Sequence, residues 1–151
     1  KFPLSDQDKE KINEMIKYLH DSQIEELADK YDLRPGMGLS AVQIGWLKRI
    51  YVVVHEYEPG KFNNYILINP RMISNSEEKI YVNREVEGIV PRFARVTMEA
   101  YDVDGNLFRV RGREELAVVF QHELDHLNGI LFFDRIDKLN PFKNSDIYRA
   151  I

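Results

Sequence analysis

The stretch FQHELDHLNG, Phe120 to Gly129, places two of the chain's four histidines four residues apart. Residues at this spacing share one face of an α-helix, so the side chains of His122 and His126 can reach one point in space. Paired imidazole nitrogens suit a divalent ion such as Zn²⁺ or Fe²⁺. A fold that binds such an ion must turn both rings of this helix towards one site.

Glu123 follows the first histidine directly and lies about 100° further around the helix. Its carboxylate can take a proton from a metal-bound water without being a ligand itself. This HExxH pattern is typical of metal hydrolases. Val118, Val119 and Phe120 give the helix an apolar face, which favours inward-facing histidines over a structural pair on the surface. A catalytic site also needs a third protein ligand, and spacing alone identifies none.

Composition narrows the class of protein. The 151 residues suffice for one domain with a sizeable core. A net charge of −4 gives no basic excess, so neither nucleic acid, DNA included, nor an anionic membrane is an expected partner. No apolar run approaches the ~20 residues that span a bilayer. The chain has no cysteine, which excludes disulfides and thiolate chemistry among these residues.

The spacing of apolar residues is typical of helices near both ends of the chain and of strands between them. Ser5 is the expected N-cap of a first helix, and the metal helix is expected to begin near Arg113. A second short helical stretch is expected over 24–31, and strands over 49–54, 65–70, 95–103 and 106–110. We expect an α+β fold in which antiparallel or mixed sheets pack around the C-terminal HExxH helix, with an N-terminal helical segment. Residues 1–151 are expected to form a single catalytic domain.

The stretch GMGLSAVQ, Gly36 to Gln43, has two glycines one residue apart, a small-residue pair and a glutamine. Together with QHELDHLNG it resembles the first and third motifs of peptide deformylase, in the same order. Ser40 replaces an alanine of the first motif, which is a mild departure. The polar insertion DSQIEELADKYDLRPG resembles the Gram-positive (type II) branch of that family. The resemblance extends from about Phe2 to Phe142.

The family's second motif, EGCLS, carries a cysteine that is the third metal ligand, and this motif is absent. EGIVP, Glu87 to Pro91, is not its equivalent, because Ile89 cannot bind a metal. The segments that flank the second motif in the family both have matches in this chain, and the two matches meet near Tyr81-Val82-Asn83. Roughly nine residues of the family pattern are absent there, including the ligand that completes the coordination shell of the metal. We expect the full polypeptide to contain a further segment here and another at its N-terminus. A true loss of the loop, giving a degenerate relative, is the alternative.

The resemblance implies a cytoplasmic, monomeric enzyme that removes the N-formyl group from the initiator methionine of nascent bacterial polypeptides, with transient ribosome association. It implies one divalent metal, natively Fe²⁺ with Ni²⁺, Co²⁺ or Zn²⁺ as substitutes, held by His122, His126 and the absent cysteine. Metal-bound hydroxide would attack the formyl carbon, with Glu123 as general base and then acid. The Gln43 amide would donate to the oxyanion.

The implied substrate is an extended peptide with an apolar first side chain. We expect Gly38 and the backbone near Met37 and Leu39 to align with it as a strand would. Val119 and Tyr81 are expected to line the methionine pocket. For Met37, Leu39 and Val119, ordinary core packing is the competing interpretation.

Two other functions stay open. An HExxH metallopeptidase of another class would need a later third ligand, but beyond His126 the chain offers no histidine or glutamate, only Asp134, Asp137 and Asp146. A binding module that retains the fold without activity is favoured only by the absent cysteine.

Overall fold

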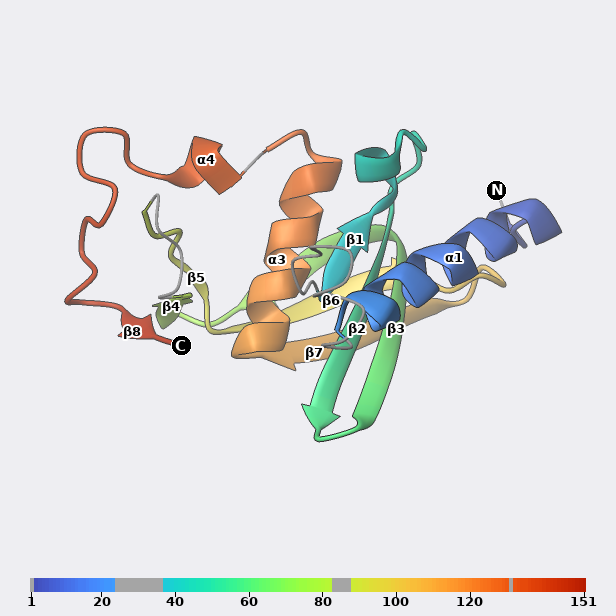
Figure 1. Cartoon of the computed structure of the whole chain (residues 1–151), viewed down its shortest axis with the longest axis horizontal. Coiled ribbons are helices and arrows are strands. Elements are labelled where there is room, and N and C mark those ends of the chain that lie inside the picture. The colour runs from blue at the N-terminus through green and yellow to red at the C-terminus, as the bar shows by residue number, and fades with distance from the viewer. Residues whose placement is uncertain (1, 24–36, 83–87, 131) are drawn as a thin grey trace. The chain divides into compact units, whose positions relative to one another are not determined.

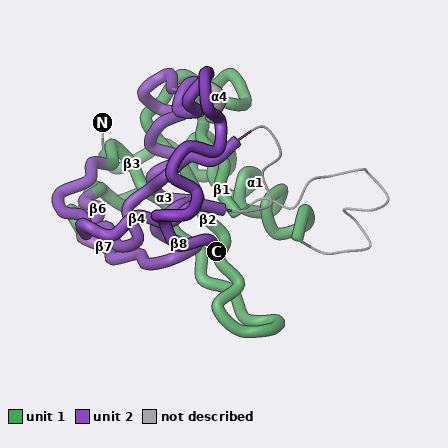
Figure 2. The backbone as a smooth tube through the Cα atoms, turned by 90° about the vertical axis from the view of Figure 1, so that its left-hand side faces the viewer, with its two compact units in different colours: residues 1–70, 100–108 green, residues 71–99, 109–151 purple. Residues whose placement is uncertain are grey.

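A computed structural model of the chain describes residues 2–23, 37–82, 88–130 and 132–151 (Figure 1). The helical stretch expected over 24–31 lies outside these ranges. Two compact units are distinguished: unit 1 is Lys1–Pro70 with Ala100–Phe108, and unit 2 is Arg71–Glu99 with Arg109–Ile151 (Figure 2). No helix in the described ranges combines the length and apolar character that crossing a membrane requires.

Unit 1 begins with helix α1, Asp6–Ser22. The Ser5 hydroxyl accepts a hydrogen bond from the Asp8 N–H at 3.1 Å, which confirms the predicted N-cap. Its apolar side chains recur every three or four residues and are buried: Ile12, Met15 and Leu19. This face packs against the apolar side chains of the neighbouring strands and forms the core of unit 1.

A five-stranded sheet has the order β1-β2-β3-β6-β7, with β1 and β7 as its end strands. The strands are β1 Gly38–Ser40, β2 Ile50–Glu58, β3 Lys61–Asn75, β6 Arg95–Tyr101 and β7 Leu107–Arg113. In unit 1, β2 pairs antiparallel with β1 and β3, so that Val52 lies opposite Leu39 and Ile66. Val52 and Val54 belong to the core that α1 covers.

Several strand boundaries differ from the prediction; β7, for example, continues to Arg113 instead of ending at residue 110. The strand expected to end at Pro70 continues to Asn75 as β3, because proline removes only one N–H from the ladder. Asn69, with a φ of 51°, marks the irregular point just before it. Pairing between β2 and β3 also extends to Glu58 and Lys61, beyond the strands expected over 49–54 and 65–70.

Unit 2 holds a second sheet and the C-terminal helices. Its strands have the order β5-β4-β8, where β4 is Lys79–Tyr81, β5 is Arg92–Phe93 and β8 is Arg149–Ala150. Helix α3, Glu115–Leu127, packs on β5, and α4 is Phe132–Arg135. β4 pairs antiparallel with β5 and parallel with β8. The mixed sheets and the helix at each end confirm the predicted α+β class.

Candidate metal centre on helix α3

Gln121 fixes helix α3 to strand β5. Its buried side-chain amide donates to the Phe93 carbonyl at 2.8 Å and accepts from the Phe93 N–H at 2.9 Å, as a neighbouring strand would. It also donates to the Ala117 carbonyl at 2.9 Å. These bonds set the rotation of the helix and so the direction of His122. No role for Gln121 was predicted from the sequence. The signal that could have found it is a polar residue beside the apolar face of the helix.

The structure brings His122, Glu123 and His126 together. The two Nε2 atoms are 2.9 Å apart, and one ligand atom from each of the three residues lies within 4.8 Å of the others. Glu123 is buried, with 3% of its surface exposed. In the part of the chain that the structure describes, no other cluster of three or more histidines and acidic residues has metal-binding geometry.

The two imidazoles suit a divalent metal. At 2.9 Å apart, both nitrogens can bind one ion at about 2.0–2.1 Å. Burial lowers the pKa of His122 to about 4, with the positive charges of Arg92 and His126 adding to the effect. Burial also lowers the pKa of His126. Both rings are therefore neutral at pH 7, as metal ligands must be. None of the 151 residues offers a thiolate as the third ligand, because the sequence has no cysteine.

An ion cluster centred on the buried carboxylate of Asp125 lies beside His122. Asp125 accepts a hydrogen bond from Arg92 Nη1 at 2.8 Å and from Arg135 Nε and Nη2 at 2.5 and 2.7 Å. Burial acts to raise the pKa of the Asp125 carboxyl, but these donors outweigh it and the pKa is lowered. Arg92 is 6% exposed, and its Nη2 also lies 3.5 Å from His122 Nδ1. Neither arginine was predicted from the sequence to be part of the site.

Gln43 belongs to unit 1, in the short 3₁₀ helix η1, Ala41–Ile44. Its side-chain oxygen accepts from the Ser40 N–H at 2.8 Å. Because the oxygen is committed to this bond, the –NH₂ group of the amide points the other way. That arrangement suits a donor, which is the role the sequence predicted for Gln43.

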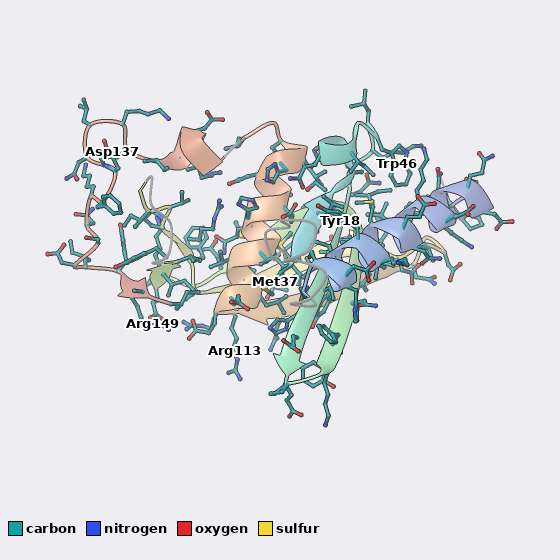
Figure 3. The ribbon with its side chains drawn as sticks, viewed as in Figure 1. Tyr18, Met37, Trp46, Arg113, Asp137 and Arg149 are labelled. Atoms are coloured by element: carbon teal, nitrogen blue, oxygen red, sulfur yellow. The ribbon has the colours of Figure 1, made fainter. Side chains whose placement is uncertain are left out.

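The residues expected to hold the peptide also lie in unit 1. Gly38 and Leu39 form β1, which pairs with β2 on one side and ends the sheet on the other. Met37, labelled in Figure 3, precedes β1, and its carbonyl accepts from the Val54 N–H at 2.7 Å. An end strand can accept an added extended peptide.

Two expected pocket residues have different surroundings in unit 2. Val119 is half-buried on α3, one turn before His122 and Glu123. Tyr81 contacts the C-terminal segment: its hydroxyl donates to the Ser145 carbonyl at 3.0 Å, and its carbonyl accepts from the Ile151 N–H at 2.9 Å. Residues 83–87, which follow the expected join, lie outside the described ranges.

Comparison with known proteins points to one family. The sequence model for polypeptide deformylase matches residues 1–142. The chain is 42% identical to peptide deformylase 2 of Bacillus subtilis (strain 168), over 99% of this chain and 86% of that protein. It is 44% identical to a peptide deformylase of Oceanobacillus iheyensis, over 93% of this chain and 81% of the relative.

Solved structures agree with these sequence matches. A plant peptide deformylase superposes with a TM-score of 0.74 at 26% identity, covering 94% of this chain and 74% of that one. A peptide deformylase from Legionella pneumophila gives a TM-score of 0.70 at 28% identity, covering 89% of this chain and 75% of that one. The helices and strands described above thus have the arrangement found in solved deformylases.

Proposed function

The chain belongs to the peptide deformylase family, and from this premise we propose that it removes the N-formyl group from the initiator methionine of nascent bacterial polypeptides. One observation carries the proposal: His122, Glu123 and His126 converge within 4.8 Å on a buried helix of a chain with this ancestry. Neither a peptidase of another class nor a binding module without activity is favoured by the comparisons.

A divalent metal is implied by the family, and His122 and His126 would hold it. When bound, such an ion polarises a carbonyl oxygen and lowers the pKa of a coordinated water. We propose Fe²⁺ as the native ion, with Ni²⁺, Co²⁺ or Zn²⁺ as substitutes, since imidazole nitrogen accepts all four.

The remaining chemistry belongs to the chain's own side chains. Glu123 takes the proton of the attacking water and returns it to the leaving amine. The Gln43 –NH₂ group donates to the developing oxyanion, a contribution of roughly 3 kcal/mol to transition-state stabilisation. The outer edge of β1, at Gly38 and Leu39, holds the peptide backbone as an added strand. Val119 and Tyr81 line the methionine pocket.

The third metal ligand is proposed to lie in a further segment near Tyr81-Val82-Asn83. The alignment with the Bacillus subtilis protein supports this, because it runs over 158 residues although this chain has 151. The relative therefore carries internal residues that have no counterpart here. Intact-mass measurement of the natural protein tests the idea, and a mass equal to the 17.8 kDa of these residues would overturn it.

We further propose that the two units work as a single catalytic domain in a cytoplasmic monomer that meets the ribosome transiently. The decisive experiment on function compares hydrolysis of formyl-Met-Ala-Ser with that of unformylated Met-Ala-Ser after metal loading. Release of formate from the first peptide alone supports deformylation. Cleavage of the unformylated peptide would support a peptidase, and metal-loaded protein that acts on neither would support a binding module.

A further inference from the structure

Five arginines stand on the exposed side of strands in unit 2. They are Arg71 on β3, Arg95 on β6, and Arg109, Arg111 and Arg113 on β7. The side chains of Arg71, Arg95 and Arg109 are 60–71% exposed. On β7 the intervening residues are partly or fully buried, so the arginines alternate with them and share one face. We call these five residues the arginine face.

Acidic residues neutralise this face only in part. Glu99 accepts from Arg71 at 2.5 and 2.9 Å and from Arg109 at 3.2 Å, so one carboxylate serves two guanidinium groups. Arg95 meets Glu78 at 3.3 Å. In the part of the chain that the structure describes, neither Arg111 nor Arg113 forms a salt bridge. A local positive field thus exists on a chain whose net charge is −4.

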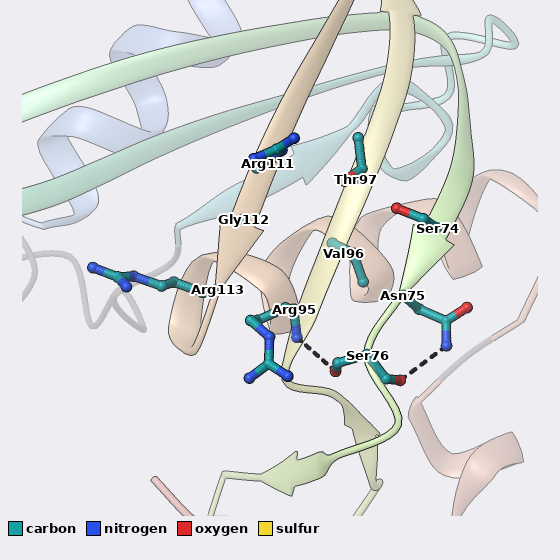
Figure 4. A pocket seen from close by; sticks show the side chains of 9 residues that line it. All are labelled: Ser74, Asn75, Ser76, Arg95, Val96, Thr97, Arg111, Gly112 and Arg113. Atoms are coloured by element: carbon teal, nitrogen blue, oxygen red, sulfur yellow. Dashed lines mark hydrogen bonds between the residues drawn. The ribbon is translucent and has the colours of Figure 1, made fainter.

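A hollow of about 410 Å³ opens between these strands (Figure 4). Hydroxyl groups of Ser74 and Thr97 line it, and Arg95, Arg111 and Arg113 surround it. In Figure 4, the side chains of Arg95 and Arg113 extend outward in different directions instead of converging. Spread charges with small hydroxyl donors between them fit a chain of phosphates better than one compact anion.

We propose that the arginine face binds the phosphodiester backbone of RNA. Alternate residues on a strand lie about 7 Å apart, comparable with the spacing of successive phosphates on an extended strand. All five cations are arginine, whose planar fork matches phosphate oxygens better than the ammonium of lysine does. No aromatic residue lines the hollow, so bases are not stacked and binding is independent of sequence.

The choice of RNA rests on the proposed function, because nascent peptides emerge from a particle whose surface is largely RNA. The charge arrangement itself does not rest on it. Protection of an end strand against aggregation is the competing explanation for charges on β7. It accounts for the charge of Arg109, Arg111 and Arg113 but not for Arg71 and Arg95 on interior strands.

Fluorescence anisotropy with a fluorescein-labelled, single-stranded RNA of mixed sequence tests the proposal. The test variant is Arg95→Gln/Arg111→Gln/Arg113→Gln. The matched control, Lys48→Gln/Lys61→Gln/Lys143→Gln, loses the same charge at exposed positions elsewhere. With three phosphates contacted, wild-type affinity should fall about 20-fold between roughly 50 and 200 mM salt. The control should behave like wild type, whereas the test variant should bind at least tenfold more weakly at low salt with a nearly flat salt response.

Equal affinity of the test variant and wild type would overturn the proposal, as would equal weakening of both variants. Competition by poly-glutamate as effective as by unlabelled RNA of equal charge would overturn it in favour of an acidic protein partner. Circular dichroism checks that each variant is folded. Deformylation of free formyl-Met-Ala-Ser is measured in parallel, so that loss of RNA binding and failure of the proposed activity are recognised separately.

Discussion

Replacing Asp125 by alanine should be among the most destabilising single changes in unit 2. The carboxylate is buried and receives hydrogen bonds from Arg92 and Arg135. These two partners differ in exposure: the Arg92 side chain is 5% exposed and that of Arg135 44%. Water can solvate Arg135 after the change, but Arg92 would remain buried without its hydrogen-bonded carboxylate, with the coulombic attraction of Glu123 as its remaining compensation. Such a loss costs about 3–5 kcal/mol of unfolding free energy.

Urea unfolding followed by far-ultraviolet circular dichroism measures this cost. Arg135→Gln is the internal control: as a half-exposed partner it should cost only about 1 kcal/mol, because Asp125 keeps Arg92. The double variant Asp125→Ala/Arg92→Met should recover part of the loss, since no buried charge is left. Equal effects of Asp125→Ala and Arg135→Gln, or a double variant less stable than the sum of its parts, would refute the reasoning.

Further substitutions separate the roles of the proposed catalytic and metal-binding residues and test the ion pairs of Glu99 on the sheet. Glu123→Ala should keep the metal, measured by elemental analysis, and abolish formate release, whereas His122→Ala should lose the metal. Gln43→Leu should lower kcat about 100-fold with metal content unchanged, measured by steady-state kinetics. Hydrogen bonds from Arg71, then Arg109, lower the pKa of Glu99 below its ordinary value of 4.5. The stability this gives is present above pH 4.5 and lost as pH falls through the lowered pKa. Acid titration of Glu99→Gln should therefore lack this limb of the unfolding curve.

The elements with strong local signals could be predicted from the sequence. The predictions of the Ser5 cap and of the β2 strand were correct because propensity and pattern agree at each. The α3 helix was predicted from its apolar face and the histidine spacing. Gly129, whose φ of 75° suits a glycine, follows its end.

The support of the site could not be predicted, because it depends on contacts between distant positions. Gln121 bonds to Phe93, and Asp125 to Arg92, across 28 and 33 residues of sequence. Nothing in the local pattern of either segment specifies such a partner. Net charge is likewise a sum over the whole chain, whereas the arginine face arises only when β3, β6 and β7 lie side by side.

Removal of the metal should leave helix α3 folded. Three groups of contacts hold the helix without any ion: the Gln121 amide on Phe93, the arginines on Asp125, and Glu114 beside its first turn, which accepts from Arg149 at 2.7 and 2.8 Å. None of these contacts uses an Nε2 atom of the histidine pair. The imidazoles are therefore preorganised, and a missing third ligand weakens metal affinity without dismantling their geometry.

Dialysis of the natural protein against a chelator, followed by circular dichroism and urea unfolding, tests this prediction. The spectrum should not change. The free energy of unfolding should fall only by the mass-action contribution of metal binding, about 2.7 kcal/mol at a hundredfold excess of free metal over Kd. Gln121→Leu serves as the opposing control, because it removes the amide pair with Phe93 while both histidines remain. It should loosen the helix whether metal is present or not. Loss of helical signal on chelation of the wild type would show instead that the ion organises α3, as in structural zinc sites.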